Sequence, residues 1–198
     1  MFWQGGAVTM SIKKFPECVS PAENTEEEIF MQNLTTAYLI RLTKVLMALS
    51  FGGFAAVVVF GNLTDYQSNF NFVTHVLSMD TTYPGNTIMY RALTATWIHH
   101  AAYWTIIATE AVIMALCLKG GYDMFKQIGA DAAAFHASKK IAIAGLLLGI
   151  LLWFFGFQAI AGEWFGMWMS KWNGLPDATR LCITLYAMLI FIAMKNDD

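Results

Sequence analysis

The sequence has few charged residues, and this shortage decides the class of protein. Asp, Glu, Lys and Arg make up 13% of the 198 residues, whereas hydrophobic residues make up 57%. A water-soluble domain carries about 25% charged residues to cover its surface. The net charge of −2 leaves no basic surface either, so we expect no nucleic-acid partner. The composition predicts an integral membrane protein that has the lipid bilayer as a partner.

Cysteine and recognisable catalytic motifs are scarce as well. Cys18, Cys117 and Cys182 are far apart, and two of them lie in apolar runs, which argues against a disulfide framework and a thiolate zinc site. The sequence holds no nucleotide-binding loop, nucleophile elbow or zinc-protease helix. Its start lacks the apolar core and cleavage site of a secretory signal. These absences point away from an enzyme without deciding the question, and they name no cofactor.

What the sequence does contain is four long apolar stretches. A helix needs about 20 residues to cross the hydrocarbon layer, because only bonds within the helix satisfy its backbone there. The stretches that meet this requirement lie at about 42–60, 97–118, 141–161 and 178–194. We therefore predict an all-α membrane protein, a four-transmembrane-helix bundle that occupies residues 37–198.

The basic residues beside these spans predict their direction. Lysine and arginine gather before the first span, between the second and third, and after the fourth. Cytoplasmic loops carry such an excess. We expect both termini and the loop 119–140 in the cytoplasm, and the loops 61–96 and 162–177 on the outer face of a bacterial inner membrane.

Residues 1–36 form an extension before the first span. Thr25 followed by Glu26, Glu27 and Glu28 matches a capping box and brings acids to the positive end of a helix. Apolar residues then recur at helical spacing. We predict an N-terminal cytoplasmic helix that follows the membrane interface into the first span.

Both outer loops have a regular pattern. Between Asn69 and Met79, apolar and polar residues separate onto two helical sides, which predicts a short helix in the headgroup plane. Trp164, Trp168 and Trp172 recur every four residues and predict one aromatic edge on a helical turn. Indoles prefer the membrane–water boundary. We favour an aromatic belt, with a wall for an apolar ligand as the alternative.

The same loops carry motifs of a known family. The motifs are Gly61-Asn62, Asp65-Tyr66, Asn69-Phe70, His75-Val76-Leu77-Ser78-Met79-Asp80, Met89-Tyr90-Arg91, Gly162-Glu163-Trp164-Phe165, Met167-Trp168 and Trp172-Asn173-Gly174. Over about residues 40–195 the chain resembles the uncharacterised bacterial family of predicted small integral membrane proteins, a domain-of-unknown-function family. The resemblance implies a four-span inner-membrane protein and carries no known activity.

Glu110, in the second span, is the best candidate for a functional residue within the membrane. It shares a helix face with His99, about 16 Å away along the axis. A carboxyl group in hydrocarbon is costly, so we expect Glu110 to face the bundle and to be protonated or partnered. A proton-handling role and a neutral hydrogen bond to a neighbouring helix are equally favoured.

A metal site on the outer face is a further candidate. His75, Asp80, His99 and Glu163 lie on or near that face, and imidazole with carboxylate suits zinc, iron or manganese. No pair has a diagnostic ligand spacing.

An ion pair of Arg91 with Asp65, Asp80 or Glu163 explains the same charges without a cofactor, and we favour it because it fastens the two outer loops together. The outer-face residues to which we assign structural or interaction roles are Asp65, Asn69, Arg91, Trp164, Trp168, Trp172 and Asn173.

The favoured function is an accessory or scaffolding subunit of a larger membrane complex. The outer loops are rich in aromatic residues and methionine, carry little charge and hold no recognisable catalytic set. They would form the contact surface for other membrane subunits. One alternative is a membrane-bound metal- or cofactor-binding enzyme subunit that uses the outer-face His, Asp and Glu residues. A second is a small transporter that uses Glu110.

Overall fold

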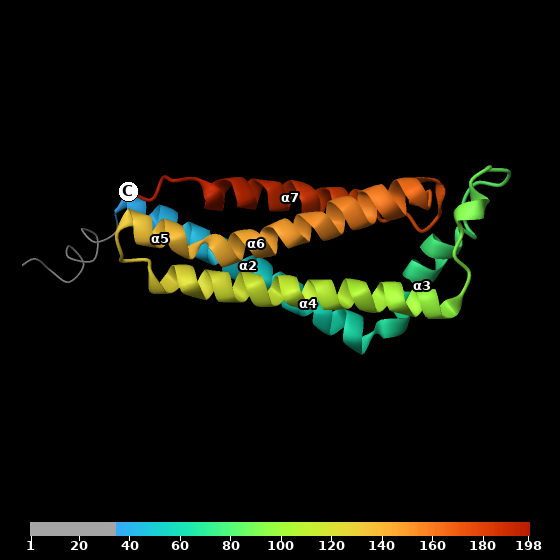
Figure 1. Cartoon of the computed structure of the whole chain (residues 1–198), viewed down its shortest axis with the longest axis horizontal. Coiled ribbons are helices and arrows are strands. Elements are labelled where there is room, and N and C mark those ends of the chain that lie inside the picture. Colours follow the sequence, from blue (N-terminus) through green and yellow to red (C-terminus); the bar gives the residue numbers. More distant parts are fainter. Residues whose placement is uncertain (1–34) are drawn as a thin grey trace, which may run out of the picture. The chain divides into compact units, whose positions relative to one another are not determined.

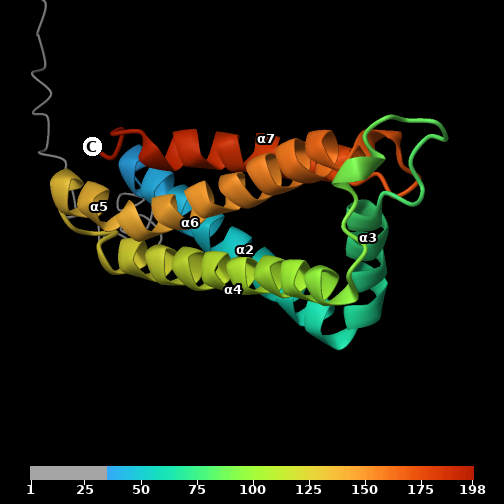
Figure 2. The same cartoon turned by 45° about the vertical axis from the view of Figure 1, so that its right-hand side comes forward.

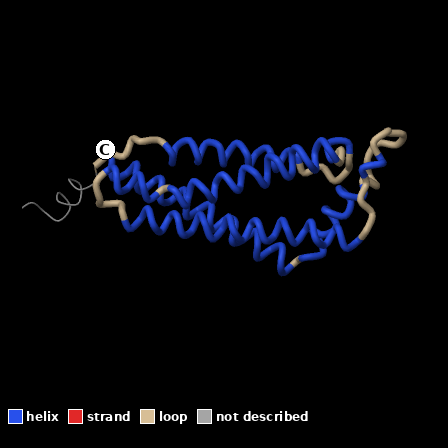
Figure 3. Tube along the Cα trace, in the orientation of Figure 1, coloured by secondary structure: helices blue, strands red, loops and turns tan. Residues whose placement is uncertain are grey.

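The structure, a computed structural model, describes residues 35–198, and helices account for most of them (Figure 1, Figure 3). Within this range there is no strand. The elements are α2 (Thr36–Thr64), α3 (Tyr66–Ser78), η1 (Met89–Arg91), α4 (Thr96–Lys126), α5 (Ala132–Ser138), α6 (Lys140–Ile150), η2 (Leu151–Trp164), η3 (Met167–Met169) and α7 (Leu175–Ala193). The predicted N-terminal helix lies, up to Leu34, outside the described residues.

Four helices are long and apolar enough to cross a membrane. They are Thr36–Thr64, Thr96–Lys126, Ala132–Trp164 and Leu175–Ala193. The third combines α5, α6 and η2. The predicted all-α, four-span fold class is confirmed, and each helix is longer than the apolar stretch that predicted it.

Local capping explains where several helices begin. Thr35 precedes α2, and its hydroxyl accepts a hydrogen bond from the Tyr38 N–H at 3.1 Å. Asp131 does the same for α5 by accepting from the Ala134 N–H at 2.8 Å. These side chains satisfy backbone donors that a helix leaves free at its start. Pro176 lies in the first turn of α7, where a missing N–H costs nothing.

Glycines allow the backbones of neighbouring spans to approach closely. A methyl group added at Gly120 of α4 would lie 2.2 Å from the backbone nitrogen of Ala142 on α6. One added at Gly145 of α6 would lie 2.7 Å from the sulfur of Cys117. Small residues at helix contacts let van der Waals packing hold membrane helices together. α4 is thereby fixed between α2 and α6, whereas α2 packs only lightly on α7.

The third span changes its winding half-way. From Leu151 to Trp164 it is a π-helix of 14 residues, and its end is marked by the Phe165 N–H donating to the carbonyl of Ile160 at 3.1 Å. π-Helical turns are rare and occur often at functional sites. Nothing in the apolar pattern of this stretch distinguishes it from an α-helix, and the sequence did not predict it.

At one end of the bundle, α3 runs across the long helices (Figure 2). It occupies the segment predicted as a short helix but begins three residues earlier, at Tyr66, and ends where Met79 adopts φ 56°. Phe70, Val73 and Val76 are buried against α4. We call residues 65–95 and 164–174 together the cap.

The predicted tryptophan edge is wrong. The helix ends at Trp164, and Gly166 then adopts φ +64°, which turns the chain before Trp168 and Trp172. Trp164 and Trp168 are exposed, while the ring of Trp172 stacks on that of His75 with centroids 4.7 Å apart. A spacing of four residues produces an edge only if one helix contains all the residues, and here two segments share them.

Candidate functional site

Glu110 is buried in the middle of α4, with 4% of its surface exposed. Side chains on a helix lean toward its N-terminus, which for α4 is the cap end of the bundle. Glu110 therefore reaches toward the last turn of α2. There its Oε2 accepts a hydrogen bond of 2.6 Å from the Asn62 side-chain amide.

Two more hydrogen bonds extend this contact across three helices. The Asn69 amide of α3 donates to Oδ1 of Asn62 at 2.7 Å. The Tyr103 hydroxyl donates to the backbone carbonyl of Asn62 at 3.3 Å. Asn62 thus joins α2, α3 and α4, and the amide chain from Asn69 to Glu110 delivers a donor to the carboxyl group. We call Asn62, Asn69, Tyr103 and Glu110 the Glu110 cluster.

The Glu110 cluster borders a cavity of about 340 Å³. Its aromatic walls include Trp153 and Phe157 of the π-helical segment, and Asp177 of α7 lies on its rim. Asp177 is exposed and pairs with Arg180 at 3.0 Å. Among residues 35–198, no lysine, arginine or histidine forms an ion pair with Glu110. The cavity therefore combines aromatic walls with a buried carboxyl group that has no cationic partner there.

The residues of the predicted metal site are brought together only in part. His75 Nδ1 lies 2.9 Å from both carboxylate oxygens of Asp80. His99 instead donates from Nε2 to the carbonyl of Leu93 at 2.7 Å, and Glu163 is exposed. Across residues 35–198, no group of three or more His, Cys, Asp or Glu residues has a geometry that could hold a metal ion.

Arg91 does fasten the two cap loops together, but not through the predicted ion pair. Its Nη1 donates to the backbone carbonyl of Trp164 at 3.2 Å, and its guanidinium lies 4.6 Å from the centre of that indole ring. Neither Asp65 nor Asp80 nor Glu163 pairs with it. A planar guanidinium stacks well on an aromatic face, and Trp164 offers that face nearby.

Other residues of the cap have identifiable local contacts, and the predicted Asn173 and Asp65 are among them. The Thr81 and Ser170 hydroxyls join the two loops at 2.6 Å. Asn173 accepts a hydrogen bond from the Leu175 N–H at 3.0 Å, just before α7. Asp65 separates α2 from α3, and its backbone N–H donates to the carbonyl of Gly61.

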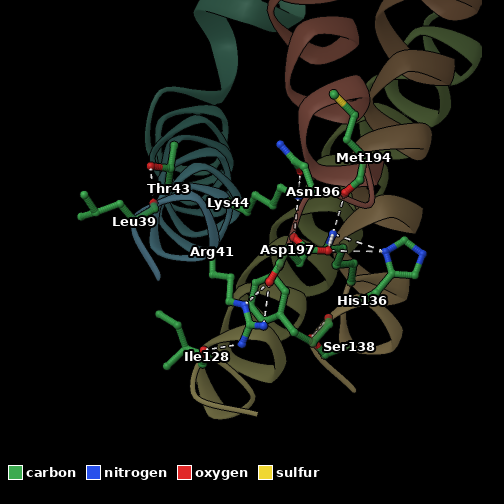
Figure 4. Close-up of polar contacts among 12 residues, drawn as sticks. Leu39, Arg41, Thr43, Lys44, Ile128, His136, Ser138, Met194, Asn196 and Asp197 are labelled. Carbon is green, nitrogen blue, oxygen red and sulfur yellow. Dashed lines mark hydrogen bonds and ion pairs between the residues drawn. The ribbon is translucent and has the colours of Figure 1, made fainter. Parts of the chain in front are cut away.

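The opposite end of the bundle holds a second buried polar cluster, which the sequence did not predict (Figure 4). Lys44 and Lys139 have no exposed side-chain surface, and both ammonium groups pair with Asp197. Lys44 Nζ donates to Asp197 Oδ1 at 2.7 Å, to Asn196 Oδ1 at 2.6 Å and to the carbonyl of Met194 at 2.8 Å. Lys139 Nζ donates to the other Asp197 oxygen and to the same carbonyl at 2.9 Å.

Arg41 completes this lysine cluster, by which we mean Arg41, Lys44, Lys139 and Asp197. Its guanidinium donates to the backbone carbonyl of Asp197 at 2.9 and 2.7 Å, and to that of Ile128 at 3.0 Å. Burial alone would raise the pKa of Asp197, but hydrogen bonds from Lys139 and Lys44 hold that pKa below its ordinary value. The C-terminal residues are thereby tied to α2 and α6.

A family model described as predicted small integral membrane protein (DUF2165) matches residues 40–195. The chain belongs to this family. Comparisons with curated proteins and with solved structures found no match. The family match covers all of the Glu110 cluster, but it ends before Asp197, so the lysine cluster takes its anion from outside the matched region.

The sequence predicted Glu110 as a candidate functional residue, but it did not predict Asn62 as the hydrogen-bond partner of Glu110. Asn62 and Glu110 are 48 residues apart, and no periodicity relates them. One feature of the sequence could have indicated this partner. Asn62 is an asparagine near the end of an apolar span, and Asn69 follows it seven residues later. An amide in that position is expensive to bury without a partner.

Proposed function

We propose that the protein binds a small cationic group of a membrane-soluble ligand in the cavity beside Glu110. One observation carries this proposal: a buried carboxyl group borders a cavity of about 340 Å³ and forms no ion pair with another described residue. Charged or polar residues inside a membrane are costly and usually mark a binding or transport path.

The walls of the cavity support a cation rather than a neutral ligand. Tyr103, Trp153 and Phe157 line it together with Glu110. Aromatic faces attract ammonium groups through their negative ring surfaces, most strongly where water is excluded. A carboxylate oxygen adds the opposite charge at short range.

The packing beyond the Glu110 cluster supports binding rather than open conduction. Toward the lysine cluster, Val45, Ala48, Ile113, Cys117 and Leu146 are almost completely buried in one core. A path through the protein would require a second conformation that separates these side chains. Transport through Glu110 is therefore a second candidate, which requires this additional conformation.

Carbodiimide modification of Glu110 tests the proposal in the purified protein in lipid nanodiscs. With an amine nucleophile present, the reagent converts carboxyl groups into stable amides, and mass spectrometry measures the modified fraction at each residue. We expect tetramethylammonium to protect Glu110 in a saturable manner and to leave the exposed Glu163 unprotected. Glu110→Gln supplies the background. Modification of Glu110 that does not change with the cation would refute the proposal.

The cap supports a second candidate, the accessory or scaffolding subunit. Its surface exposes Tyr83, Tyr90, Trp164 and Trp168, and the Arg91–Trp164 contact holds the two loops in place. Exposed aromatic residues on a rigid surface are typical of protein contacts. Purification from native membranes in mild detergent tests it: a defined partner should co-purify with the wild-type chain and be lost with Trp168→Ala. A wild-type chain that purifies alone excludes this candidate.

We also propose that the cap faces outward from a bacterial inner membrane, with α3 at the membrane interface and both termini in the cytoplasm. The distribution of lysine and arginine supports this direction. In a cysteine-free background, a membrane-impermeant maleimide should label Gln67→Cys in intact cells and leave Lys126→Cys unlabelled. The reverse pattern would invert the topology.

His75 and Asp80 support the metal-dependent alternative to the extent that they form a pair. Zinc and iron accept histidine nitrogen and carboxylate oxygen together, and the pair leaves positions for further ligands. Elemental analysis of the purified protein tests it, with His75→Ala as the matched control. A metal content that His75→Ala leaves unchanged removes these residues from the site.

A further inference from the structure

A groove separates α2 from α7 along the side of the bundle. Its volume is about 480 Å³, and its lining is mainly apolar: Leu46, Ser50 and Phe54 belong to α2, and Leu181, Thr184 and Met188 belong to α7. It exists because α2 packs on α4 and only lightly on α7.

The groove adjoins the cavity beside Glu110. Leu181 lines both spaces. On α2 the same helix side continues from Phe54 through Val58 to Asn62. The groove begins at Thr43, so together the two spaces follow about 28 Å of α2, which is close to the thickness of the hydrocarbon layer. One end is polar and carries Glu110, whereas the remainder is apolar.

We infer that these two spaces hold one ligand, a single-chain cationic amphiphile. Its ammonium head lies beside Glu110 and its alkyl tail lies between α2 and α7, pointing toward the lysine cluster. This inference rests on the proposed function and adds to it the binding of an alkyl tail in the groove. Charge complementarity selects the cation, because the carboxyl group beside the aromatic walls has no cationic partner among the described residues.

The shape of the groove selects a single chain. The groove lies in the gap between α2 and α7, and residues of both helices line it. An anionic amphiphile would bring like charges together at Glu110. A long neutral chain would fill the apolar part and leave the carboxyl group without a counter-charge.

Chain length and groove-blocking variants test the inference in nanodiscs. The probes are tetramethylammonium, hexadecyltrimethylammonium and hexadecyl sulfate, and the readout is protection of Glu110 from carbodiimide. We expect hexadecyltrimethylammonium to protect at least tenfold more strongly than tetramethylammonium, and hexadecyl sulfate not to protect.

Amphiphiles with a long chain also concentrate in the bilayer, and this alone would increase their protection of Glu110. Variants that fill the groove distinguish this effect from binding of the tail in the groove. Ser50→Trp on α2 and Thr184→Trp on α7 each fill the groove without touching Glu110. In both variants, hexadecyltrimethylammonium should protect Glu110 no more strongly than tetramethylammonium does. The protection by tetramethylammonium should stay as in the wild type. Val57→Trp is the matched control, because Val57 is 71% exposed on α2 and does not line the groove. It should keep the stronger protection by hexadecyltrimethylammonium.

The outcomes separate the two levels of the proposal. If the long chain keeps its full advantage in both groove variants, its tail lies in bulk lipid and the inference is wrong, although the Glu110 site stands. If no cation protects Glu110, the proposed function itself is wrong. If Ser50→Cys forms a disulfide between two copies of the chain, a second copy covers the groove and the inference fails. Unchanged elution and unprotected labelling of Glu110 verify that each variant is folded.

Discussion

The Glu110 cluster and the lysine cluster are both polar and both buried, yet they are satisfied to different degrees. Each ammonium group of the lysine cluster has three partners within 3.3 Å, and the backbone carbonyl groups around Arg41 are bonded as well. Glu110 has the Asn62 amide on one oxygen and a cavity beside it. The first arrangement is complete in itself, whereas the second has room for another molecule.

In the proposed function, this difference separates a structural role of the lysine cluster from a binding role of the Glu110 cluster. A buried charge destabilises the fold unless it is paired and hydrogen-bonded, and removing one member of such a pair is costly. A fully satisfied cluster therefore holds the C-terminal residues to the bundle. The proposed function has the Glu110 carboxyl group contribute its charge to a ligand in the neighbouring cavity.

Removal of Asp197 should have the largest effect on stability. Asp197→Ala leaves two buried ammonium groups without a counter-charge, and we expect it to lower the free energy of unfolding by about 3–5 kcal/mol. Chemical unfolding in detergent, followed by tryptophan fluorescence, measures it. Asp198→Ala is the neighbouring control and should cost less than about 0.5 kcal/mol. Equal effects of the two substitutions would mean that the lysine cluster does not hold the end of the chain.

Substitution at the Glu110 cluster should affect binding more than folding. We expect Asn62→Ala to weaken the protection of Glu110 by tetramethylammonium about tenfold, or about 1.4 kcal/mol. Carbodiimide labelling of Glu110 measures this protection, and Glu110→Gln supplies the background. If either variant unfolds as readily as Asp197→Ala, the two clusters do not differ in the proposed way.

Acid should weaken the lysine cluster. Because the pKa of Asp197 in the folded protein lies below its ordinary value of about 3.9, its contribution is present above that value and is lost as the pH falls through the folded pKa. The free energy of unfolding should fall more steeply on acidification in the wild type than in Asp197→Asn. Parallel curves for the two proteins would contradict the assignment.

The smallest effect is expected in the cap. Arg91→Lys keeps the charge but loses the planar stack on Trp164, which is worth about 0.5–1 kcal/mol at an exposed site. Hydrogen exchange in residues 79–95 should accelerate a few-fold while exchange in α4 stays unchanged. No change in the loop would show that Thr81 and Ser170 suffice to join the two parts of the cap.

The sequence predicted those features that depend on one stretch of chain. The four spans follow from run length and hydrophobicity, and Glu110 is conspicuous as the carboxyl group within such a run. Features that need a pairing across the fold were missed. Asn62 meets Glu110 from another helix, and Lys44 and Lys139 meet Asp197 across about 150 and about 60 residues of chain. Nothing local marks these partners.

Two errors have local physical causes. The lysines of the lysine cluster were interpreted only as signals of membrane orientation, and a residue can serve that role and an ion pair at once. The tryptophan edge depended on an unbroken helix, which Gly166 interrupts by adopting a positive φ.

The metal site of His75, Asp80, His99 and Glu163 stays a prediction. Of these residues, the structure brings together His75 and Asp80.

The most direct test of the account is the labelling of Glu110 in nanodiscs as the concentration of tetramethylammonium rises. The account predicts a saturable fall in modified Glu110 while modified Glu163 stays constant. A constant fraction at Glu110, or an equal fall at both residues, would contradict a cation site in the interior of this bundle.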